Sequence, residues 1–288
     1  MAHVGAIGVW SSLLRLGDAH EVADAAAELE EIGFDAIWVP GRGAVDLDER
    51  LRLLLGSTDR IAVATGIVSI WTNPAGETAA MRARLAAEFG DRFLLGLGVS
   101  HAPLVDGSGG HYTRPFSAMV AYLDELDASP DPVLPEDRIL AALAPKMLEL
   151  ARERALGSHP YLVTPAHTRI AREALGPDAL LAPELTVVLE TDPDQARAIA
   201  RTFIGRYLQL PNYVDNLLRT GFDPTDVEGG GSDRLIDDVI AWGDVDAIGA
   251  RIADHRAAGA DHVALQVLTA DAERLPREEW RQLATALR

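Results

Sequence analysis

The sequence predicts that the whole chain forms a (β/α)8 barrel, and three observations carry this prediction. Strand-like and helix-like patterns alternate along nearly all of the 288 residues, as repeated βα units around a parallel sheet require. The strand candidates are nearly continuous apolar runs, which is typical of a parallel sheet covered on both faces. Eight such strands can be placed, and eight strands favour closure into a barrel. Barrels of about 250 residues are single units, so we assign residues 1–288 to one domain.

Capping and turn residues set the limits of the predicted elements. In chain order, strands are expected at residues 4–9, 36–39, 61–68, 93–97, 138–143, 158–163, 182–189 and 262–267. Four helices are preceded by a capping residue, followed in three cases by a proline for the first turn: Asp18, Asn73-Pro74, Thr164-Pro165 and Asp192-Pro193. Gly33 is expected to end the first helix, because glycine readily takes the conformation of a helix C-cap.

The alternation of strands and helices fails in two places. Residues 100–112 form a glycine-rich stretch that we expect to be a loop. Residues 191–244 are too long for one βα unit, with a helix expected to about Leu210 and a break at residues 228–232. We interpret 191–244 as an insertion between strands 7 and 8 that serves as a lid or an interface region, since long barrel insertions commonly do so.

Composition excludes several classes of protein. The chain has no cysteine, which excludes disulfides, thiolate catalysis and cysteine-bound metals. Its net charge of −18 argues against nucleic acid and membrane surfaces as partners, because both attract clustered cations. No apolar run approaches the roughly 20 residues that span a bilayer. The first residues lead directly into a predicted strand and not into a basic, apolar leader, so we expect a cytoplasmic protein.

Motifs for metals and nucleotides are missing from the sequence. The histidines show no spacing typical of metal ligands, so no metal site is expected. Gly96 and Gly98 lack the third glycine of a dinucleotide fingerprint, and the three glycines at 229–231 lack the lysine of a phosphate-binding loop. The last three glycines are expected to form a hinge in the lid.

Six segments in order resemble the bacterial luciferase-like monooxygenase superfamily, and within it the oxidoreductases that use the deazaflavin coenzyme F-420. These segments are 5–10 (GAIGVW), 33–38 (GFDAIW), 60–66 (RIAVATG, followed by Asn73-Pro74), 90–98 (GDRFLLGLG), 157–161 (GSHPY) and 259–267 (GADHVALQV). The resemblance implies a (β/α)8 barrel of the luciferase-like type, usually a homodimer, with the cofactor at the carboxyl ends of the strands.

The resemblance places the ring of the cofactor at two strand ends. Gly66 and Ile67 match the site of a bulge with a non-prolyl cis peptide that backs the central ring, although Gly66 could instead only relieve packing. Gly98, Val99 and Ser100 match the loop near the ribityl chain or the reacting face.

His101 follows that loop and is the candidate catalytic residue. Some F-420 enzymes carry a carboxylate at the matching position, and an imidazole with a pKa near 6.5 could exchange the proton that accompanies hydride transfer. The alternative is that His101 only bonds a loop carbonyl.

The resemblance also places the cofactor phosphate near Gly157, Ser158 and His159. Small residues ahead of a helix N-terminus suit an anion, because exposed N–H groups and the helix dipole favour negative charge. His159 could instead be an ordinary turn residue before Pro160.

A substrate pocket is expected around four further side chains. Arg42 lies after the second strand, where several relatives have an acidic residue or an Asp-His pair that this chain lacks. It could contact an anionic substrate or the cofactor tail, or it could be a solvated loop residue. Trp10, Trp71 and Tyr112 are candidate pocket walls, although aromatic residues at strand ends are also ordinary core.

The leading hypothesis is an oxidoreductase that transfers a hydride between F-420 and a small organic substrate. The first alternative is an FMN-dependent monooxygenase that uses O₂ and a partner reductase. A cofactor-free lyase or isomerase would need a lysine or a carboxylate at the strand ends, for which Lys146 and Glu184 are the candidates. A non-catalytic flavin-binding homologue is the last alternative.

Overall fold

The strands form one parallel sheet that follows the chain order closely. The computed structural model describes residues 2–43, 46–107 and 111–286. The order in the sheet is β10-β9-β11-β1-β2-β3-β5-β6-β7-β8, with β4 paired to β5. The strands are β1 Ile7–Trp10, β2 Ala36–Val39, β3 Ala62–Thr65, β4 Val68–Ser69, β5 Phe93–Gly98, β6 Arg138–Leu140, β7 Gly157–Ser158, β8 Leu180–Leu181, β9 Glu184–Val188, β10 Ala241–Trp242 and β11 Val263–Leu268.

The stretch that contains β8 and β9 closes this sheet into a barrel. β8 pairs with β7, whereas β9 pairs with β11 at the other end of the order. Between the two strands, Ala182 N donates to Ser158 O over 2.9 Å and Pro183 O accepts from Ala264 N over 2.9 Å. The predicted strand at 182–189 corresponds to β9, and β8 lies just before the predicted range, separated from β9 by Ala182 and by Pro183, which has no N–H for the ladder.

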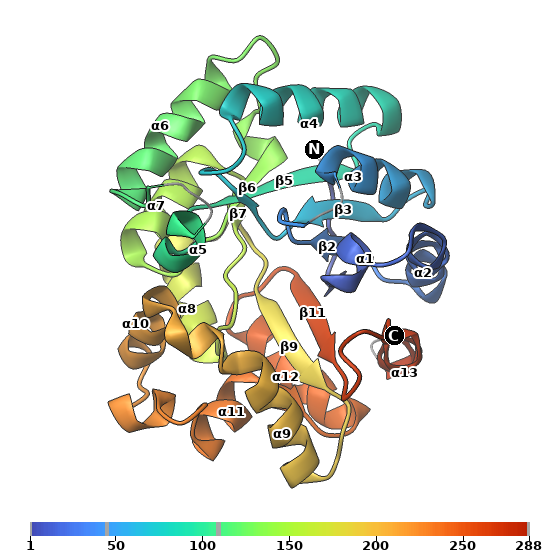
Figure 1. Cartoon of the computed structure of the whole chain (residues 1–288), viewed down its shortest axis with the longest axis vertical. Coiled ribbons are helices and arrows are strands. Elements are labelled where there is room, and N and C mark those ends of the chain that lie inside the picture. The colour runs from blue at the N-terminus through green and yellow to red at the C-terminus, as the bar shows by residue number, and fades with distance from the viewer. Residues whose placement is uncertain (1, 44–45, 108–110, 287–288) are drawn as a thin grey trace.

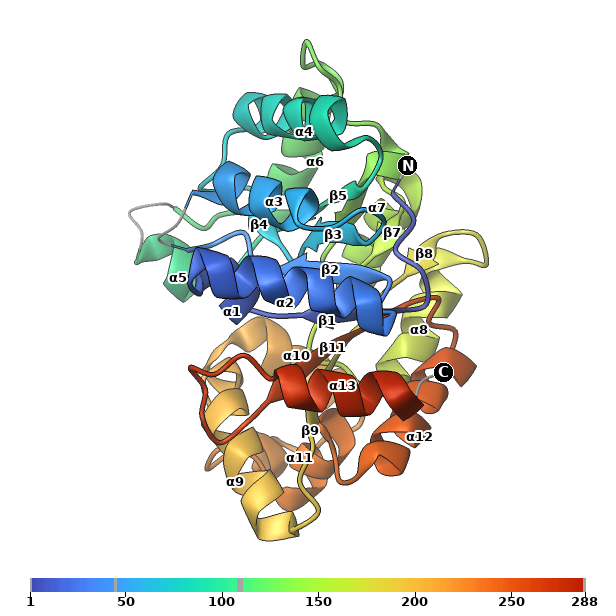
Figure 2. The same ribbon diagram turned by 90° about the vertical axis from the view of Figure 1, so that its right-hand side faces the viewer.

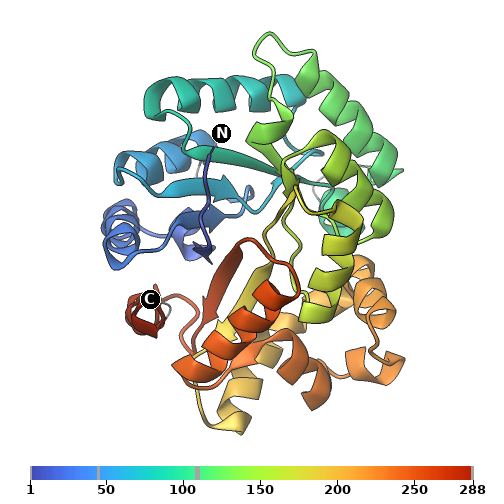
Figure 3. The ribbon, with the colours of Figure 1, turned by 180° about the vertical axis from the view of Figure 1, so that it is seen from behind.

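Helices cover the outside of the barrel (Figures 1 and 3). Figure 2 shows α13 alongside α2, which brings the last helix next to the first long one. The helices are α1 Leu13–Leu16, α2 Ala19–Ile32, α3 Leu47–Gly56, α4 Ala75–Phe89, α5 Ala102–Asp106, α6 Pro115–Asp127, α7 Pro145–Arg154, α8 Pro165–Leu175, α9 Pro193–Ile204, α10 Pro211–Arg219, α11 Asp233–Val239, α12 Val245–Ala257 and α13 Arg277–Ala286, with short 3-10 helices η1 Pro135–Asp137, η2 Tyr207–Gln209 and η3 Pro224–Val227.

The predicted helix caps are largely confirmed. Asp18 accepts hydrogen bonds from His20 N and Glu21 N, and Thr164 and Asp192 cap their helices in the same way. Gly33 ends α2 with a φ of 96°. Asn73 is the exception, because its side-chain amide donates to Ser69 O and the helix begins after Pro74.

Two regions differ from the simplest βα pattern. The expected loop at 100–112 contains the short helix α5, and its residues 108–110 lie outside the described part of the chain. The long stretch between β9 and α12 holds α9, α10 and α11 and ends in β10, which pairs with β9. These helices gather at one end of the molecule in Figure 1 and have a hydrophobic core of their own.

The barrel has two further cores. One core lies between the sheet and the surrounding helices and is filled by large side chains such as Leu29 and Leu54. Trp38, Leu94 and Ile139 fill the interior of the barrel. In the described residues, no helix combines the length and the apolar character needed to cross a membrane.

Candidate active site

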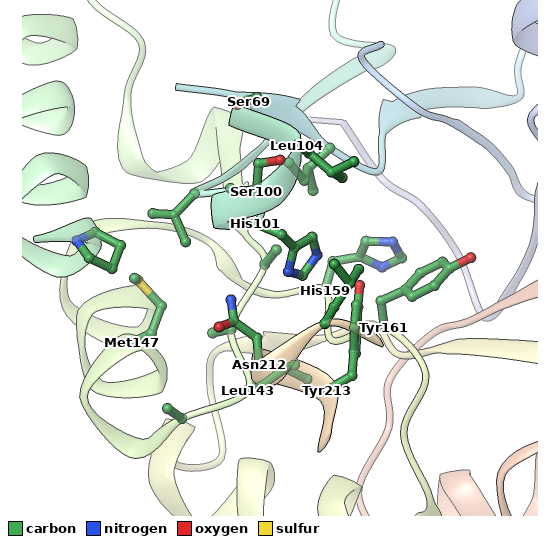
Figure 4. A pocket seen from close by; sticks show the side chains of 18 of the residues that line it. Ser69, Ser100, His101, Leu104, Leu143, Met147, His159, Tyr161, Asn212 and Tyr213 are labelled. Carbon is green, nitrogen blue, oxygen red and sulfur yellow. The ribbon is translucent and has the colours of Figure 1, made fainter. Parts of the chain in front are cut away.

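A cavity of about 590 Å³ opens at the carboxyl ends of the strands, the face where barrel enzymes place their active sites. Side chains of the barrel and of the segment around α10 line it together (Figure 4). The predicted site residues that line the cavity are Trp10, Arg42, Gly66, Ile67, Gly98, Val99, Ser100, His101, Tyr112 and His159. The structure therefore brings together most of the residues that the sequence singles out.

The peptide bond between Gly66 and Ile67 is cis, as the resemblance implies. The predicted strand at 61–68 is accordingly divided here into β3 and β4. Trp10 Nε1 donates to Gly66 O over 3.2 Å, which holds the bond against the end of β1. A Cβ atom on Gly66 would lie 2.4 Å from Trp10 Nε1 and 2.9 Å from His159 Nε2, so there is no room for a side chain.

The end of β5 is supported by Trp71, which does not itself line the cavity. Its Nε1 donates to Val99 O over 2.6 Å, and its ring lies 5.5 Å from the ring of Tyr112. The expectation that Trp71 forms a pocket wall is therefore corrected. It lies behind two residues that do form the wall.

His101 lies directly before α5 and projects into the cavity (Figure 4). Its Nδ1 is buried without a hydrogen-bond partner among the described residues, and its ring is 4.9 Å from that of Tyr213. Burial lowers the pKa of His101 to about 4. The imidazole is therefore neutral at pH 7, which corrects the expectation of a pKa near 6.5.

His159 presents a hydrogen-bond acceptor at the floor of the cavity. Its Nδ1 lies 2.6 Å from Ala182 O and must donate, since a carbonyl only accepts. The lone pair is therefore on Nε2, which is buried and has no partner in the described structure. Burial lowers the pKa of His159 to about 4, which keeps the ring neutral.

Gly157 and Ser158 are not in the cavity, which corrects the prediction that they bind the cofactor phosphate. Ser158 is fully buried, and its Oγ has no partner among the described residues. A Cβ atom on Gly157 would lie 1.9 Å from Leu180 O, so this residue is pressed against the neighbouring strand. These two residues make up the strand β7, and His159 is the first residue after them that lines the cavity.

Three tyrosines that the sequence prediction missed complete the wall. Tyr161 donates from its hydroxyl to Gln266 Oε1 over 2.6 Å, and its oxygen lies 3.0 Å from that of Tyr207. Tyr213 stands edge-on to Tyr207 at 5.3 Å. Tyr207 lies in η2 and Tyr213 in α10. The amphipathic pattern of α10 was the sequence feature that could have pointed to Tyr213.

Cations line the cavity at its exposed mouth. Arg42 comes from the loop after β2, Lys146 from α7 and Arg219 from α10, and no ion pair with a carboxylate is seen for them in the described residues. Lys146 is the only lysine of the chain. Asp215 is the one acidic side chain that shares this lining in the described structure.

Glu184 lies under the wall and not in the cavity. Its carboxyl group accepts from Leu162 N over 3.1 Å and from Thr186 Oγ1 over 2.6 Å. Burial raises the pKa of Glu184 to about 7. The two groups named for a lyase, Lys146 and Glu184, therefore do not meet at one cavity.

The residues of the cavity fit a flat, largely neutral cofactor ring. The volume is within the range of about 300–1,000 Å³ that small-molecule sites occupy. His159 Nε2 and His101 Nδ1 are buried polar atoms that lack partners, as expected where a ligand supplies them. No group of three or more potential metal ligands occurs in the described residues.

Comparison with known proteins agrees with this geometry. Residues 2–127 match the model of the luciferase-like monooxygenase family. Over 99% of its length the chain is similar to an F-420-dependent secondary alcohol dehydrogenase in complex with an F-420–acetone adduct, at 16% identity, 100% coverage of that chain and a TM-score of 0.75. None of the curated proteins compared with this chain matches its sequence.

Two further solved structures show the same fold. A coenzyme F-420-dependent tetrahydromethanopterin reductase from Methanopyrus kandleri is 15% identical, with 99% of each chain covered and a TM-score of 0.74. The oxygenating constituent of 3,6-diketocamphane monooxygenase from Pseudomonas putida, in complex with FMN, is 13% identical, with 97% of this chain and 96% of that chain covered and a TM-score of 0.70. The chain thus has the luciferase-like barrel fold, and residues 2–127 confirm the sequence resemblance to that family.

Proposed function

We propose that the protein is an oxidoreductase that transfers a hydride between coenzyme F-420 and a small organic substrate. The observation that carries this proposal is the floor of the cavity, where the cis bond of Gly66 and Ile67 lies beside the unpartnered His159 Nε2. The resemblance implies that this bond backs the central ring of the cofactor. Two of the similar structures belong to F-420-dependent enzymes, which supports a deazaflavin.

The residues of the cavity have distinct tasks in this proposal. When bound, the deazaflavin supplies a two-electron hydride, and the protein orients the reactants and excludes water. His159 would offer Nε2 as an acceptor to an N–H group of the ring. Leu104, Phe116 and Met147 would cover the reactants with apolar surface. The cations at the mouth would attract the negative groups of the coenzyme.

The test is equilibrium binding of the purified protein to F-420 and to FMN, followed by absorbance and protein fluorescence. Hydride transfer is then assayed with F-420 and a panel of small ketones and secondary alcohols. We expect F-420 to bind at least about tenfold more tightly than FMN, a difference of about 1.4 kcal/mol. Binding of neither compound overturns the proposal.

An FMN-dependent monooxygenase that uses O₂ and a partner reductase is the second candidate. The likeness to the FMN-bound monooxygenase constituent favours it, because that structure shares the barrel over 97% of this chain. Tighter binding of FMN than of F-420, together with oxygen consumption when a reductase is added, would establish this function in place of the first.

We also propose that the protein forms a homodimer through α4 and α6. These helices pack against each other on the outside of the barrel (Figure 1). Light scattering on the purified protein measures the mass in solution. A mass of one chain at micromolar concentration would overturn this assembly without affecting the proposed chemistry.

A further inference from the structure

We propose that the hydroxyl group of Tyr213 gives its proton to the substrate oxygen during hydride transfer, so that Tyr213 is a catalytic residue. The inference rests on the proposed function. It assigns a chemical role to a side chain of α10, outside the βα units that supply the floor of the cavity.

Among the three clustered tyrosines, only Tyr213 keeps its hydroxyl available. The Tyr161 hydroxyl donates to Gln266 Oε1 and lies within hydrogen-bond distance of the Tyr207 hydroxyl, so these two groups satisfy each other. No hydrogen bond to the Tyr213 hydroxyl is seen in the described residues. The Tyr213 hydroxyl is not one of the buried unpartnered atoms, and its residue lines the cavity, so it is open to a ligand oxygen there.

The surroundings hold the Tyr213 ring in one place. It contacts the rings of Tyr207 at 5.3 Å, Tyr161 at 6.2 Å and His101 at 4.9 Å, and 8% of the residue is exposed. Tyr213 and His101 lie next to each other in the lining of the cavity (Figure 4). A substrate in this cavity would therefore meet a fixed hydroxyl group beside the His101 ring.

The charges around Tyr213 keep it in the donor form. Burial raises the pKa of Tyr213 well above 10, and Tyr207 and the buried Glu184 raise it further. Tyr161 and Tyr207 also have raised pKa values through burial. His101 is neutral at pH 7 because burial lowers its pKa to about 4. At neutral pH the cavity thus contains a phenol and a neutral imidazole.

For a carbonyl substrate, the proton would move from the Tyr213 hydroxyl to the substrate oxygen. When bound, reduced F-420 would supply the hydride: its own C–H bond would break, the coenzyme would be oxidised by two electrons, a C–H bond would form at the carbonyl carbon, and the electron pair of the C=O π bond would move to the oxygen. The O–H bond of Tyr213 breaks as that oxygen takes the proton, which yields an alcohol and a phenolate. Water at the open mouth returns a proton to the phenolate. An alkoxide is a stronger base than a phenolate, so even a phenol with a raised pKa can donate to it.

Binding of an unreactive carbonyl analogue tests the contact without turnover. The chain has five tyrosines, so 3-fluorotyrosine labelling gives five ¹⁹F signals, and the one lost in Tyr213→Phe is assigned. The F-420-loaded protein is titrated with acetamide, isobutyramide and benzamide. We expect the Tyr213 signal to shift, and the affinity for the amide that binds best to fall about fivefold in Tyr213→Phe, as for one lost hydrogen bond. Absence of any change in the Tyr213 signal overturns the inference.

Kinetics separate a donor from a residue that only shapes the wall. We expect Tyr213→Phe to lower kcat for ketone reduction by about 100-fold to 10,000-fold with a small change in KM. Tyr122→Phe is the matched control, because its buried hydroxyl bonds Asn73 O and Thr78 Oγ1 away from the cavity. Equal kcat values in Tyr213→Phe and the wild type overturn the inference.

The pH profile distinguishes Tyr213 from His101 as the donor. With Tyr213 as donor, the rate of reduction should be constant between about pH 6 and 9. A protonated His101 as donor would make the rate fall tenfold per pH unit above about pH 4. Glu184 has a pKa near 7 and lies beneath the tyrosines, so the profile is repeated in Glu184→Gln to remove its charge. If F-420 does not bind at all, the proposed function fails; if it binds and reduces ketones without Tyr213, only this inference fails.

Discussion

The indole ring of Trp38 stacks on the imidazole of His159, with centroids 4.2 Å apart and planes 14° apart. Trp38 also donates from Nε1 to His262 Nε2 over 3.0 Å, and His262 Nδ1 lies 3.1 Å from Gly5 O. The interior of the barrel therefore fixes the His159 ring on one face and through its Nδ1, while Nε2 stays free for a ligand.

We predict that His159→Leu weakens the binding of F-420 by about tenfold, as expected for the loss of one hydrogen bond to a buried acceptor. Fluorescence titration measures the change. His255→Leu is the matched control, because His255 is also fully buried and bonds Thr168 through Nδ1, but lies outside the cavity. An unchanged affinity in His159→Leu would remove His159 from the cofactor site.

Gly66→Ala should impair both folding and ligand binding. The added methyl group would press on Trp10 Nε1 and His159 Nε2, and overpacking of this kind costs about 1–3 kcal/mol. Gly76→Ala in α4 has open space around it and should stabilise the protein by about 0.5–1 kcal/mol. Urea unfolding and F-420 titration measure the two effects. A Gly66→Ala protein as stable as Gly76→Ala would contradict the crowding at the cis bond.

Glu184 should make stability depend on pH in a defined direction. Its pKa in the folded state, about 7, is above the unfolded value of 4.5, so its stabilising contribution is complete below pH 4.5 and is lost as pH rises to 7. Relative to Glu184→Gln, we expect the wild type to lose about 1.4 kcal/mol per pH unit across this window.

Unfolding in urea at pH 5, 6, 7 and 8 checks this prediction. Glu149→Gln removes a carboxyl group from the exposed surface and should show no such trend. An equal difference in unfolding free energy between the wild type and Glu184→Gln at pH 5 and at pH 8 would show that burial does not perturb Glu184.

The rate of chemical modification of Lys146 should report whether the cavity is occupied. Because it is the only lysine, an amine-selective reagent modifies Lys146 and the α-amino group alone. We expect saturating F-420 to slow modification of Lys146 by at least about fivefold, and less at high salt, since exposed charges are screened. Mass spectrometry follows both sites, with the α-amino group as the reference. Equal protection of both amines, or of neither, would exclude a cofactor group at Lys146.

The pattern of the barrel could be predicted from sequence because buried parallel strands are apolar runs. The strand 36–39 is observed as predicted. In place of the predicted strand at 158–163, the structure has the two-residue strand Gly157–Ser158. The strand does not continue because Pro160 lacks an N–H and Leu162 takes a φ of 56°. Ser158 was assigned to the phosphate site by the resemblance, and the structure covers it because it lies within β7.

The functional face was less accessible to prediction. Gly66, Ile67 and His101 were predicted because each lies at or just after the end of a predicted strand, and strand ends can be placed from the nearby sequence. Tyr213 was missed because it reaches the cavity from a helix more than 100 residues away in the chain from His101. No local periodicity reports such a contact. The pKa of His101 was missed for the same reason, because burial by distant elements causes its shift.

The two halves of the cavity belong to different hydrophobic cores. The floor with His159 is held by the interior of the barrel, whereas Tyr213 belongs to the separate core of the helices α9 to α11. Residues in the second core can therefore be exchanged with little disturbance of the strands. Over evolutionary time, such a chain could acquire a new substrate through substitutions in α9 to α11, while the strand ends that we propose bind the cofactor stay unchanged.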